Sequence, residues 1–296
     1  RAMSGPTPST GDRISAKLGD RARNAGLDAQ SLRLRYVLER LLWRMERTGA
    51  TEHFESKGAL SVLHWTGGSF SRPTEDMDLN GSGEPESAVE RIRASIEEAA
   101  RLDADDGVTF EPDSITVRKV REGVVAGGKI ELAAHLGQTR LKVRVDAGLG
   151  NPMVPEPEAH EIPALVDGYP GPTVRLCPLE TTISEKLSAA VRHGMFNTRV
   201  KDAYDLWHAA TSGIAFDGGD LAEAVRRTME HQRLDLPEGV PDGLSDAWAA
   251  KSEKAWKKFL RSKKLEAPDL KDTMATVRSF ALPALEAARG DAPDDL

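Results

Sequence analysis

Apolar residues spaced three and four positions apart mark the first helix that the sequence predicts. The repeat runs from Leu34 to Met45, and Gly49 supplies a stop signal. The same spacing predicts a short helix over Ala59–Trp65 and an amphipathic helix around Glu86–Leu102. The other faces of the first helix are expected to carry most of its five arginines, Arg33, Arg35, Arg40, Arg44 and Arg47.

Alternation of apolar and polar residues predicts strands in the middle of the chain. Thr139–Ala147 places its leucine and valines on one face and its polar residues, including Asp146, on the other. Lys129–His135 is also typical of a strand, and we expect these two segments to pair across a tight turn. Shorter strands are expected just before Gly58 and just after Pro73.

The second half of the chain has a different character. Residues 152–172 are rich in proline and predict a surface connection, and from Leu179 onward the pattern is helical. The sequence therefore predicts an α+β protein, in which a domain with a mixed, twisted sheet is followed by an α-helical domain. The predicted parts are a flexible tail over 1–12, a sheet-containing domain over 13–175, a helical domain over 176–289 and a disordered tail over 290–296.

Composition narrows the classes of protein that remain. The chain has 296 residues, enough for two domains, and its formal net charge of −7 argues against a protein that coats nucleic acid throughout. The only cysteine, Cys177, excludes an internal disulfide and reads as a small buried hydrophobe in a reducing compartment. Apolar runs are too short to span a bilayer, and residues 1–12 do not read as a signal peptide. We therefore expect a cytoplasmic protein with no membrane partner.

Asp76 and Asp78 form the most distinctive chemical feature. Residues two apart in a strand point to the same face, so these carboxylates would lie side by side. Such a pair resists ionisation unless a cation lies between its members, and oxygen ligands suit a hard ion such as Mg²⁺. The pair therefore suggests metal-dependent phosphoryl or nucleotidyl transfer. An acidic turn before Asn80-Gly81 explains the pair, taken alone, equally well.

Further motifs follow in an order known from one superfamily. A Lys57-Gly58 turn opens a helix, Thr74-x-Asp76-x-Asp78 comes next, and a later strand carries Asp146. This order resembles the DNA polymerase β-like nucleotidyltransferase superfamily. There, a glycine turn at a helix N-terminus receives triphosphate, and paired carboxylates hold Mg²⁺.

Two helical motifs narrow the resemblance. Glu185-Lys186-Leu187 precedes a K-D-x-x-D-L motif that begins at Lys201, and the chain up to Trp207 resembles the MenT-like, AbiEii/AbiGii-type nucleotidyltransferase toxins. The resemblance implies a polymerase β-like domain and a helical domain. It implies transfer of a nucleoside monophosphate from an NTP to the 3′ end of tRNA with Mg²⁺ or Mn²⁺, which blocks translation and growth. It also implies a cognate antitoxin, either a binding protein or a kinase.

The resemblance implies roles for single residues as well. The catalytic positions are Asp76, Asp78, Asp146, Lys186 and Asp202, with Asp202 preferred to Asp205 as the last acid. The first three of these would bind the metal, and Lys186 would contact the triphosphate. The nucleotide-binding positions are Lys57, Gly58, Ala59, Arg72, Thr74 and Lys186. Thr74 is also the position where related toxins can carry a regulatory phosphate, and Ala59 departs from the glycine or serine of many relatives.

Basic residues in the helical half would suit an RNA acceptor. The RNA-binding candidates are Arg192, Arg199, Lys254, Lys257, Lys258 and Arg261. Trp256 and Phe259 lie among the last four and would offer an aromatic ring for stacking. The alternative is a solvated helix face whose aromatic residues pack inward.

Other interpretations remain open at this point. Lys186 could be a solvated side chain beside an apolar face, and Asp205 could pair with Lys201. A haloacid dehalogenase-type phosphatase also uses D-x-D, but it needs an apolar strand before the first aspartate. The alternatives that keep the fold are nucleotide transfer to a protein hydroxyl, including that of Thr74, and a catalytically idle module that binds an antitoxin.

Overall fold

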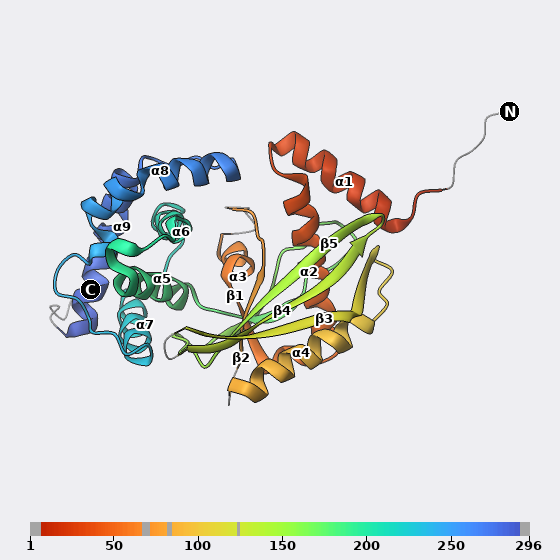
Figure 1. Ribbon diagram of the computed structural model, residues 1–296, viewed down its shortest axis with the longest axis horizontal. Coiled ribbons are helices and arrows are strands. Elements are labelled where there is room, and N and C mark those ends of the chain that lie inside the picture. The colour runs from red at the N-terminus through yellow and green to blue at the C-terminus, as the bar shows by residue number, and fades with distance from the viewer. Residues whose placement is uncertain (1–6, 67–71, 82–84, 123–124, 291–296) are drawn as a thin grey trace.

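The computed structural model describes residues 7–66, 72–81, 85–122 and 125–290, which form two lobes (Figure 1). The N-terminal lobe combines a mixed sheet with helices, and the C-terminal lobe is helical. The helices of the N-terminal lobe are α1 (Thr10–Ala25), α2 (Ala29–Arg47), α3 (Gly58–Trp65) and α4 (Pro85–Arg101), with the 3₁₀ turn η1 (Ala50–His53). The predicted fold class, a mixed sheet followed by a helical part, is confirmed.

Within the described residues the sheet has seven strands in the order β3-β4-β5-β2-β1-β7-β6. β2 runs parallel to β5 and β1 runs parallel to β7, while the other neighbours are antiparallel. The strands are β1 (Phe54–Lys57), β2 (Met77–Gly81), β3 (Val108–Glu122), β4 (Val125–Leu136), β5 (Thr139–Leu149), β6 (Glu158–Glu161) and β7 (Thr173–Leu176). The central strand, β2, is the one that follows Pro73.

Burial along β5 shows how the lobe is layered. Leu141, Val143 and Val145 are buried against the side of the sheet where α2 and α4 pack, and the residues between them are exposed or half-buried. Each such aliphatic side chain contributes about 1.5–3 kcal/mol when fully buried. The predicted pairing of Lys129–His135 with Thr139–Ala147 is confirmed, because β4 and β5 are antiparallel neighbours.

Three of the five arginines of α2 are buried, namely Arg35, Arg40 and Arg44, although the sequence pattern places them outside its apolar face. Arg40 and Arg44 are each 1% exposed, and both contact the Asp106 carboxylate, at 3.1 Å and 2.8 Å. Arg44 also donates hydrogen bonds to the main-chain oxygens of Leu102 and Val108. Buried charges persist only with partners of this kind, and the loop before β3 supplies them.

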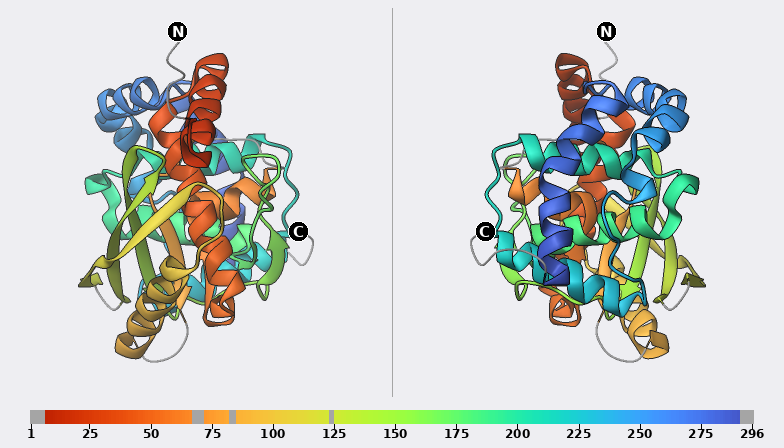
Figure 2. Two further views of the ribbon diagram at one scale, coloured as in Figure 1. Left: turned by 90° about the vertical axis from the view of Figure 1, so that its right-hand side faces the viewer. Right: turned by 90° about the vertical axis from the view of Figure 1, so that its left-hand side faces the viewer.

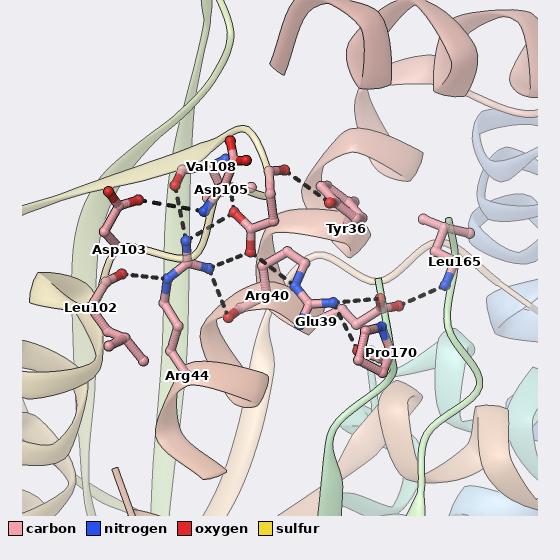
Figure 3. Close-up of polar contacts among 11 residues, drawn as sticks. Tyr36, Glu39, Arg40, Arg44, Leu102, Asp103, Asp105, Val108, Leu165 and Pro170 are labelled. Atoms are coloured by element: carbon pink, nitrogen blue, oxygen red, sulfur yellow. Dashed lines mark hydrogen bonds and ion pairs between the residues drawn. The ribbon is translucent and has the colours of Figure 1, made fainter. Parts of the chain in front are cut away.

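The same helix buries Glu39 beside these arginines. Its Oε2 accepts a hydrogen bond from the Leu165 N–H at 3.0 Å, and its Oε1 lies 3.8 Å from Arg40 (Figure 3). Burial raises the pKa of Glu39 to about 7, although Arg35 and Arg40 oppose the shift. Arg40 also donates to the Pro170 oxygen at 2.8 Å, so this network ties α2 to the connection between β6 and β7.

The C-terminal lobe has an apolar core of its own. Its helices are α5 (Leu179–His193), α6 (Val200–Thr211), α7 (Gly218–His231), α8 (Asp246–Lys263) and α9 (Leu270–Arg289), with the 3₁₀ turns η2 (Gly194–Phe196) and η3 (Asp242–Leu244). Trp65 at the end of α3 packs against the cores of both lobes, and its indole N–H donates to the Cys177 oxygen at 3.1 Å. Cys177 is fully buried, as predicted, and burial raises the pKa of its thiol to about 12.

Several elements lie outside the predicted pattern. The helix α1 begins at Thr10, within the segment 1–12 expected to be a tail, and Ser9 caps it by accepting from the Asp12 N–H. The strand β6 lies in the proline-rich segment expected to be a plain surface connection. The ends 1–6 and 291–296 of the predicted tails lie outside the described residues. Among the helices of the described residues, none is long and apolar enough to cross a membrane.

Candidate active site

The three aspartates predicted to bind metal lie together on one face of the sheet. Asp78 in β2 is the register neighbour of Asp146 in β5, and Asp76 lies just ahead of β2, two residues before Asp78. Carboxylate oxygens of all three lie within 4.8 Å of one another. The parallel pairing of β2 with β5 thus joins two distant parts of the sequence.

The charges around this cluster favour a bound cation. Burial and the charge of Asp76 raise the pKa of Asp78 to about 6, against the opposing effect of Lys57 and Lys201. At the outer edge, Lys129 donates a hydrogen bond of 2.6 Å to Asp146. Three converging carboxylates form an oxygen-only donor set, which suits Mg²⁺ or Mn²⁺. The cluster therefore fits a divalent metal ion.

The predicted glycine turn lies directly beside the cluster. The strand β1 ends at Lys57 and α3 begins at Gly58, with Ala59 in its first turn. Gly58 has a φ of 65°, in the left-handed region that favours glycine, and a Cβ atom there would overlap the Asp78 carboxylate. The N–H groups that open a helix lack partners within it and favour anions such as phosphate.

Ion pairs between the lobes surround the cluster. Among the described residues, three of them join Lys57 with Glu185, Arg72 with Asp205 and Glu75 with Lys263. Arg72 donates to both oxygens of Asp205, at 2.8 Å and 3.1 Å. A two-bond contact of this kind fixes the guanidinium in one orientation.

Lys186 on α5 lies at the centre of a second charged group. Its Nζ is 2.8 Å from Asp205 and 3.3 Å from Asp202, and Arg199 donates to Asp202 at 2.6 Å. Burial lowers the pKa of Lys186, but the two carboxylates outweigh it, so the pKa lies above its usual value and the side chain is protonated. Burial alone would raise the pKa of Asp205, but Lys186 and Arg72 lower it to about 2.

A cavity of about 240 Å³ lies between the carboxylates and this charged group. Both lobes line it, through Lys57, Gly58, Arg72, Asp78, Leu79, Asp146, Gly148, Thr182, Glu185, Lys186, Arg199, Lys201 and Asp202. Asp205 lines a separate, smaller hollow. Thr74, predicted to bind nucleotide or carry a phosphate, is only 3% exposed.

A second cavity, of about 210 Å³, adjoins the first and shares Lys57, Glu185 and Arg199 with it. Arg192 lines the second cavity and donates to the Gln232 side-chain oxygen at 2.7 Å. Two of the residues predicted to bind RNA, Arg192 and Arg199, therefore lie at the site.

The remaining residues predicted to bind RNA lie on α8, away from these cavities' linings. They are all exposed: Lys254, Lys257, Lys258 and Arg261. Trp256 is fully buried, and Phe259 stacks on it in the C-terminal core. The aromatic residues of α8 thus pack inward, as expected if α8 has a solvated basic face and an apolar face against the core.

Sequence reasoning gave no role to three residues that the structure places at the site. Glu185 precedes Lys186 in its motif, and Lys201 opens the K-D-x-x-D motif, so motif position was an available signal for both. Lys129 lies opposite Asp146 in the register of β4 and β5. Its role depends on strand pairing, which local pattern does not record.

The solved structures that are similar to this chain include those of MenT4 and of an H. pylori protein. The solved structure of MenT4, a nucleotidyltransferase toxin from Mycobacterium tuberculosis H37Rv, matches with a TM-score of 0.54 at 17% identity, over 96% of this chain and 99% of that chain. A putative nucleotidyltransferase from H. pylori matches with a TM-score of 0.49 at 16% identity, over 90% of this chain and 100% of that chain. At this sequence identity, the similarity to MenT4 shows only that the fold is shared. No curated protein sequence matches the chain.

The match to a protein family extends over most of the chain and is not limited to one motif. The model of the nucleotidyl transferase AbiEii toxin, type IV toxin–antitoxin system, covers residues 40–288. This range contains the aspartate cluster, the glycine turn and the charged group around Lys186. The resemblance stated from the sequence is confirmed, and the chain is a nucleotidyltransferase, whose substrate is an NTP. It belongs to the AbiEii nucleotidyl transferase toxin family of type IV toxin–antitoxin systems.

Proposed function

We propose that this toxin transfers a nucleoside monophosphate from an NTP to the 3′ end of tRNA, with release of pyrophosphate, and so blocks translation and growth. The observation that carries the proposal is the meeting of Asp76, Asp78 and Asp146 within 4.8 Å of one another, beside a cavity lined by lysines and arginines. One side of the cavity suits a cation and the other suits a polyphosphate. Nucleotidyl transfer requires both.

We assign Asp76, Asp78 and Asp146 as the ligands of Mg²⁺ or Mn²⁺. The ion would neutralise phosphate charge and lower the pKa of the attacking hydroxyl. The repulsion that raises the pKa of Asp78 is relieved when a cation shares the carboxylates. The three side chains therefore have a physical reason to bind an ion together.

The triphosphate would lie between Lys186 and the start of α3. Lys186 is protonated and lines the cavity, so it can pair with a phosphate oxygen. The main-chain N–H groups of Gly58 and Ala59, together with Lys57, would receive the same group from the other side. Arg72 is held by Asp205, so it would present its remaining N–H groups in a fixed orientation.

The acceptor hydroxyl would approach from the side of Asp146 and Asp202. Burial raises the pKa of Asp202, but Lys186 and Arg199 outweigh it, so the pKa is lowered and Asp202 is ionised. An ionised carboxylate at this position can orient the 3′-hydroxyl, and its proton would pass to Asp146 or Asp202. Asp205 would act as a positioning residue for Lys186 and Arg72.

Membership of a type IV toxin–antitoxin family implies an antitoxin partner. We propose that this partner is a binding protein or a kinase that modifies Thr74, and that the toxin acts in the cytoplasm. We also propose that residues 13–175 and 176–289 are separate domains, since each surrounds its own apolar core. Thr74 is only 3% exposed, so phosphate transfer by a kinase and nucleotide transfer to the Thr74 hydroxyl would both require the segment before β2 to open.

The test is incubation of the protein with total tRNA, Mg²⁺ and each labelled NTP in turn, with Asp76→Asn as the matched inactive variant. Label on RNA that requires both Mg²⁺ and Asp76 supports the proposal. Label on protein with none on RNA overturns the choice of acceptor. If neither RNA nor protein is labelled, the idle antitoxin-binding module is the better account.

A further inference from the structure

One face of β3–β5 carries a row of cations that begins at the aspartate cluster. On β5, Arg144, Lys142 and Arg140 precede Asp146 by two, four and six residues, so the four side chains share a face. The three cations are 52%, 54% and 66% exposed, respectively. At ~3.4 Å per residue, the row extends about 20 Å along the strand.

The neighbouring strands widen this row. Lys129 on β4 is the register partner of Asp146, and Arg118 on β3 is the partner of Lys129. We call these five residues, Arg118, Lys129, Arg140, Lys142 and Arg144, the cationic sheet face. Within residues 108–120 and 127–149 of these strands, the carboxylates on the same face are those of Glu111, Glu131 and Asp146, and the register places Glu122 at the end of β3 on this face as well. A chain of net charge −7 thus concentrates a positive surplus beside its catalytic cluster.

The glutamates on this face are exchangeable partners. Glu131 contacts Lys142 at 2.6 Å and Arg144 at 3.5 Å, and Glu111 contacts Arg140 at 3.2 Å. Every side chain in these pairs is more than a third exposed, so solvent screens the pairs and they contribute little to stability. The cations can therefore turn from a glutamate to a phosphate at small cost.

The face is also hollowed where β3 loses its register with β4, between Glu111 and Thr116. The hollow measures about 470 Å³, and its polar lining consists of Ser114, Thr116, Glu131, Arg140 and Lys142. The Ser114 hydroxyl already donates to the Glu111 oxygen and accepts from the Ala133 N–H, which leaves the hydroxyl of Thr116. A hydroxyl next to cations suits a sugar–phosphate chain, in which ribose hydroxyls alternate with phosphates.

We infer that the cationic sheet face binds the sugar–phosphate backbone of the RNA acceptor and leads its 3′ end to Asp146. This inference rests on the proposed function and adds where the RNA lies. Backbone contacts position a nucleic acid without reading its sequence, so the face would serve different tRNAs alike. The rigid strand fixes the distance from these contacts to the carboxylates.

The basic face of α8 is the rival surface. Both views of Figure 2 place α8 (blue) and the β3–β5 strands (yellow to green) on the same side of the molecule. In the part of the chain that the structure describes, α8 pairs with the segment before β2 through its last residue, Lys263, whose partner is Glu75, whereas β5 itself contains a residue of the site. The primary contact is therefore assigned to the sheet.

The experiment compares three triple variants, each of which removes three positive charges. The sheet variant is Arg140→Gln, Lys142→Gln and Arg144→Gln. The rival variant on α8 is Lys254→Gln, Lys257→Gln and Lys258→Gln. The control variant on α4, which packs on the opposite face of the sheet, is Arg91→Gln, Arg93→Gln and Arg101→Gln. Binding of labelled total tRNA is measured without NTP over a range of salt concentrations, and heat unfolding confirms that each variant is folded.

We expect the sheet variant to bind tRNA at least ~10-fold more weakly than the wild type at ~0.1 M salt, with a slope of log K against log salt smaller by about 2–3. The control variant should bind as the wild type does. Arg140→Lys with Arg144→Lys keeps the charge and should retain the affinity.

Two results would overturn the assignment and leave tRNA as the acceptor. One is an unchanged affinity and salt slope in the sheet variant, and the other is an equal or larger loss in the α8 variant. A wild type that labels protein and binds no tRNA would instead overturn the proposed acceptor together with this inference. Because binding is measured without NTP, a defect in catalysis alone does not affect the comparison.

Discussion

Gly58 packs directly against Asp78, and the two residues leave no room for a Cβ atom between them. The φ of 65° at Gly58 is a second restraint, since side chains are strained in that region. The first residue of α3 is thus fixed by its own backbone and by a carboxylate of the aspartate cluster. The turn that opens the helix and the metal-binding face of the sheet form one unit.

Gly58→Ala is expected to displace the Asp78 carboxylate or to unwind the first turn of α3. Transfer activity should fall by at least ~100-fold, because a displacement near 1 Å has that effect on positioned groups. Gly26→Ala is the matched control, since Gly26 has a φ of 67° and, apart from its own chain neighbours, no heavy atom lies within 4 Å of the place that an added methyl group would take. The control should lose about 1 kcal/mol of stability and no activity. Equal losses of activity in both variants would contradict the steric account.

Asp78→Asn is expected to abolish stabilisation by metal and nucleotide together. Heat unfolding with and without Mg²⁺ and NTP measures this stabilisation. The free energy of unfolding of the wild type should rise by about 2.7 kcal/mol when the ligand is at 100 times its Kd. Without metal, the variant should be more stable than the wild type at pH 8, because a buried carboxylate and its repulsion from Asp76 are removed. Asp167→Asn, at an exposed position, is the control. An unchanged gain with Mg²⁺ and NTP in Asp78→Asn would exclude Asp78 as a ligand.

Asp205→Asn is expected to destabilise the junction between the lobes. Arg72 and Lys186 would each lose a buried partner, at a cost of about 2–4 kcal/mol. Lys186→Met combined with Asp205→Asn should cost less than the sum of the single changes, as urea unfolding would show. A double-mutant cycle at the exposed pair Arg226–Glu223 provides the comparison, and its coupling free energy should be below ~1 kcal/mol. Strict additivity at Lys186 and Asp205 would show that the pair is not coupled.

Glu39 is expected to give the stability a pH dependence. Its pKa rises from 4.5 to about 7 on folding, so the folded protein holds this proton more tightly than the unfolded chain does. The resulting stabilisation, at most about 3 kcal/mol, is present below pH ~4.5 and is lost as the pH rises through about 7. Glu39→Gln should therefore flatten the free energy of unfolding between pH 5 and 8.

The matched control for this measurement is Glu46→Gln on the same helix. Glu46 also accepts a hydrogen bond from a main-chain N–H, that of Thr173 at 3.0 Å, but it lies at an exposed contact. This variant should keep the wild-type pH profile. A Glu39→Gln protein with the wild-type profile would show that another group causes the dependence.

The sequence predicts which residue types form the site better than it predicts how distant residues come together there. Strand periodicity predicts that Asp76 and Asp78 lie side by side, but only Asp78 is in a strand, because β2 begins at Met77 and Asp76 lies just before it. The approach of Asp146 depends on β5 pairing with β2, and that of Lys186 depends on how the lobes pack. These long-range relations came from family resemblance, because no local pattern contains them.

Burial of charge was the least predictable property. The pattern places Arg40 and Arg44 outside the apolar face of α2, and their burial depends on the carboxylate of Asp106, which lies far along the chain. The strand β6 has four residues with little burial, so it lacks the alternation that marks a strand in the sequence. In both cases the deciding partner is distant in sequence and close in space.

Because ion pairs join the two lobes, the salt concentration should affect how firmly the lobes are held together. Lys57 with Glu185, Arg72 with Asp205 and Glu75 with Lys263 span the junction, and the last of these is the most exposed. Salt weakens exposed pairs first and buried ones least. Rising ionic strength should therefore loosen the rim at Glu75 while Arg72 and Asp205 still hold the two halves in register, so the molecule would open from its edge inward.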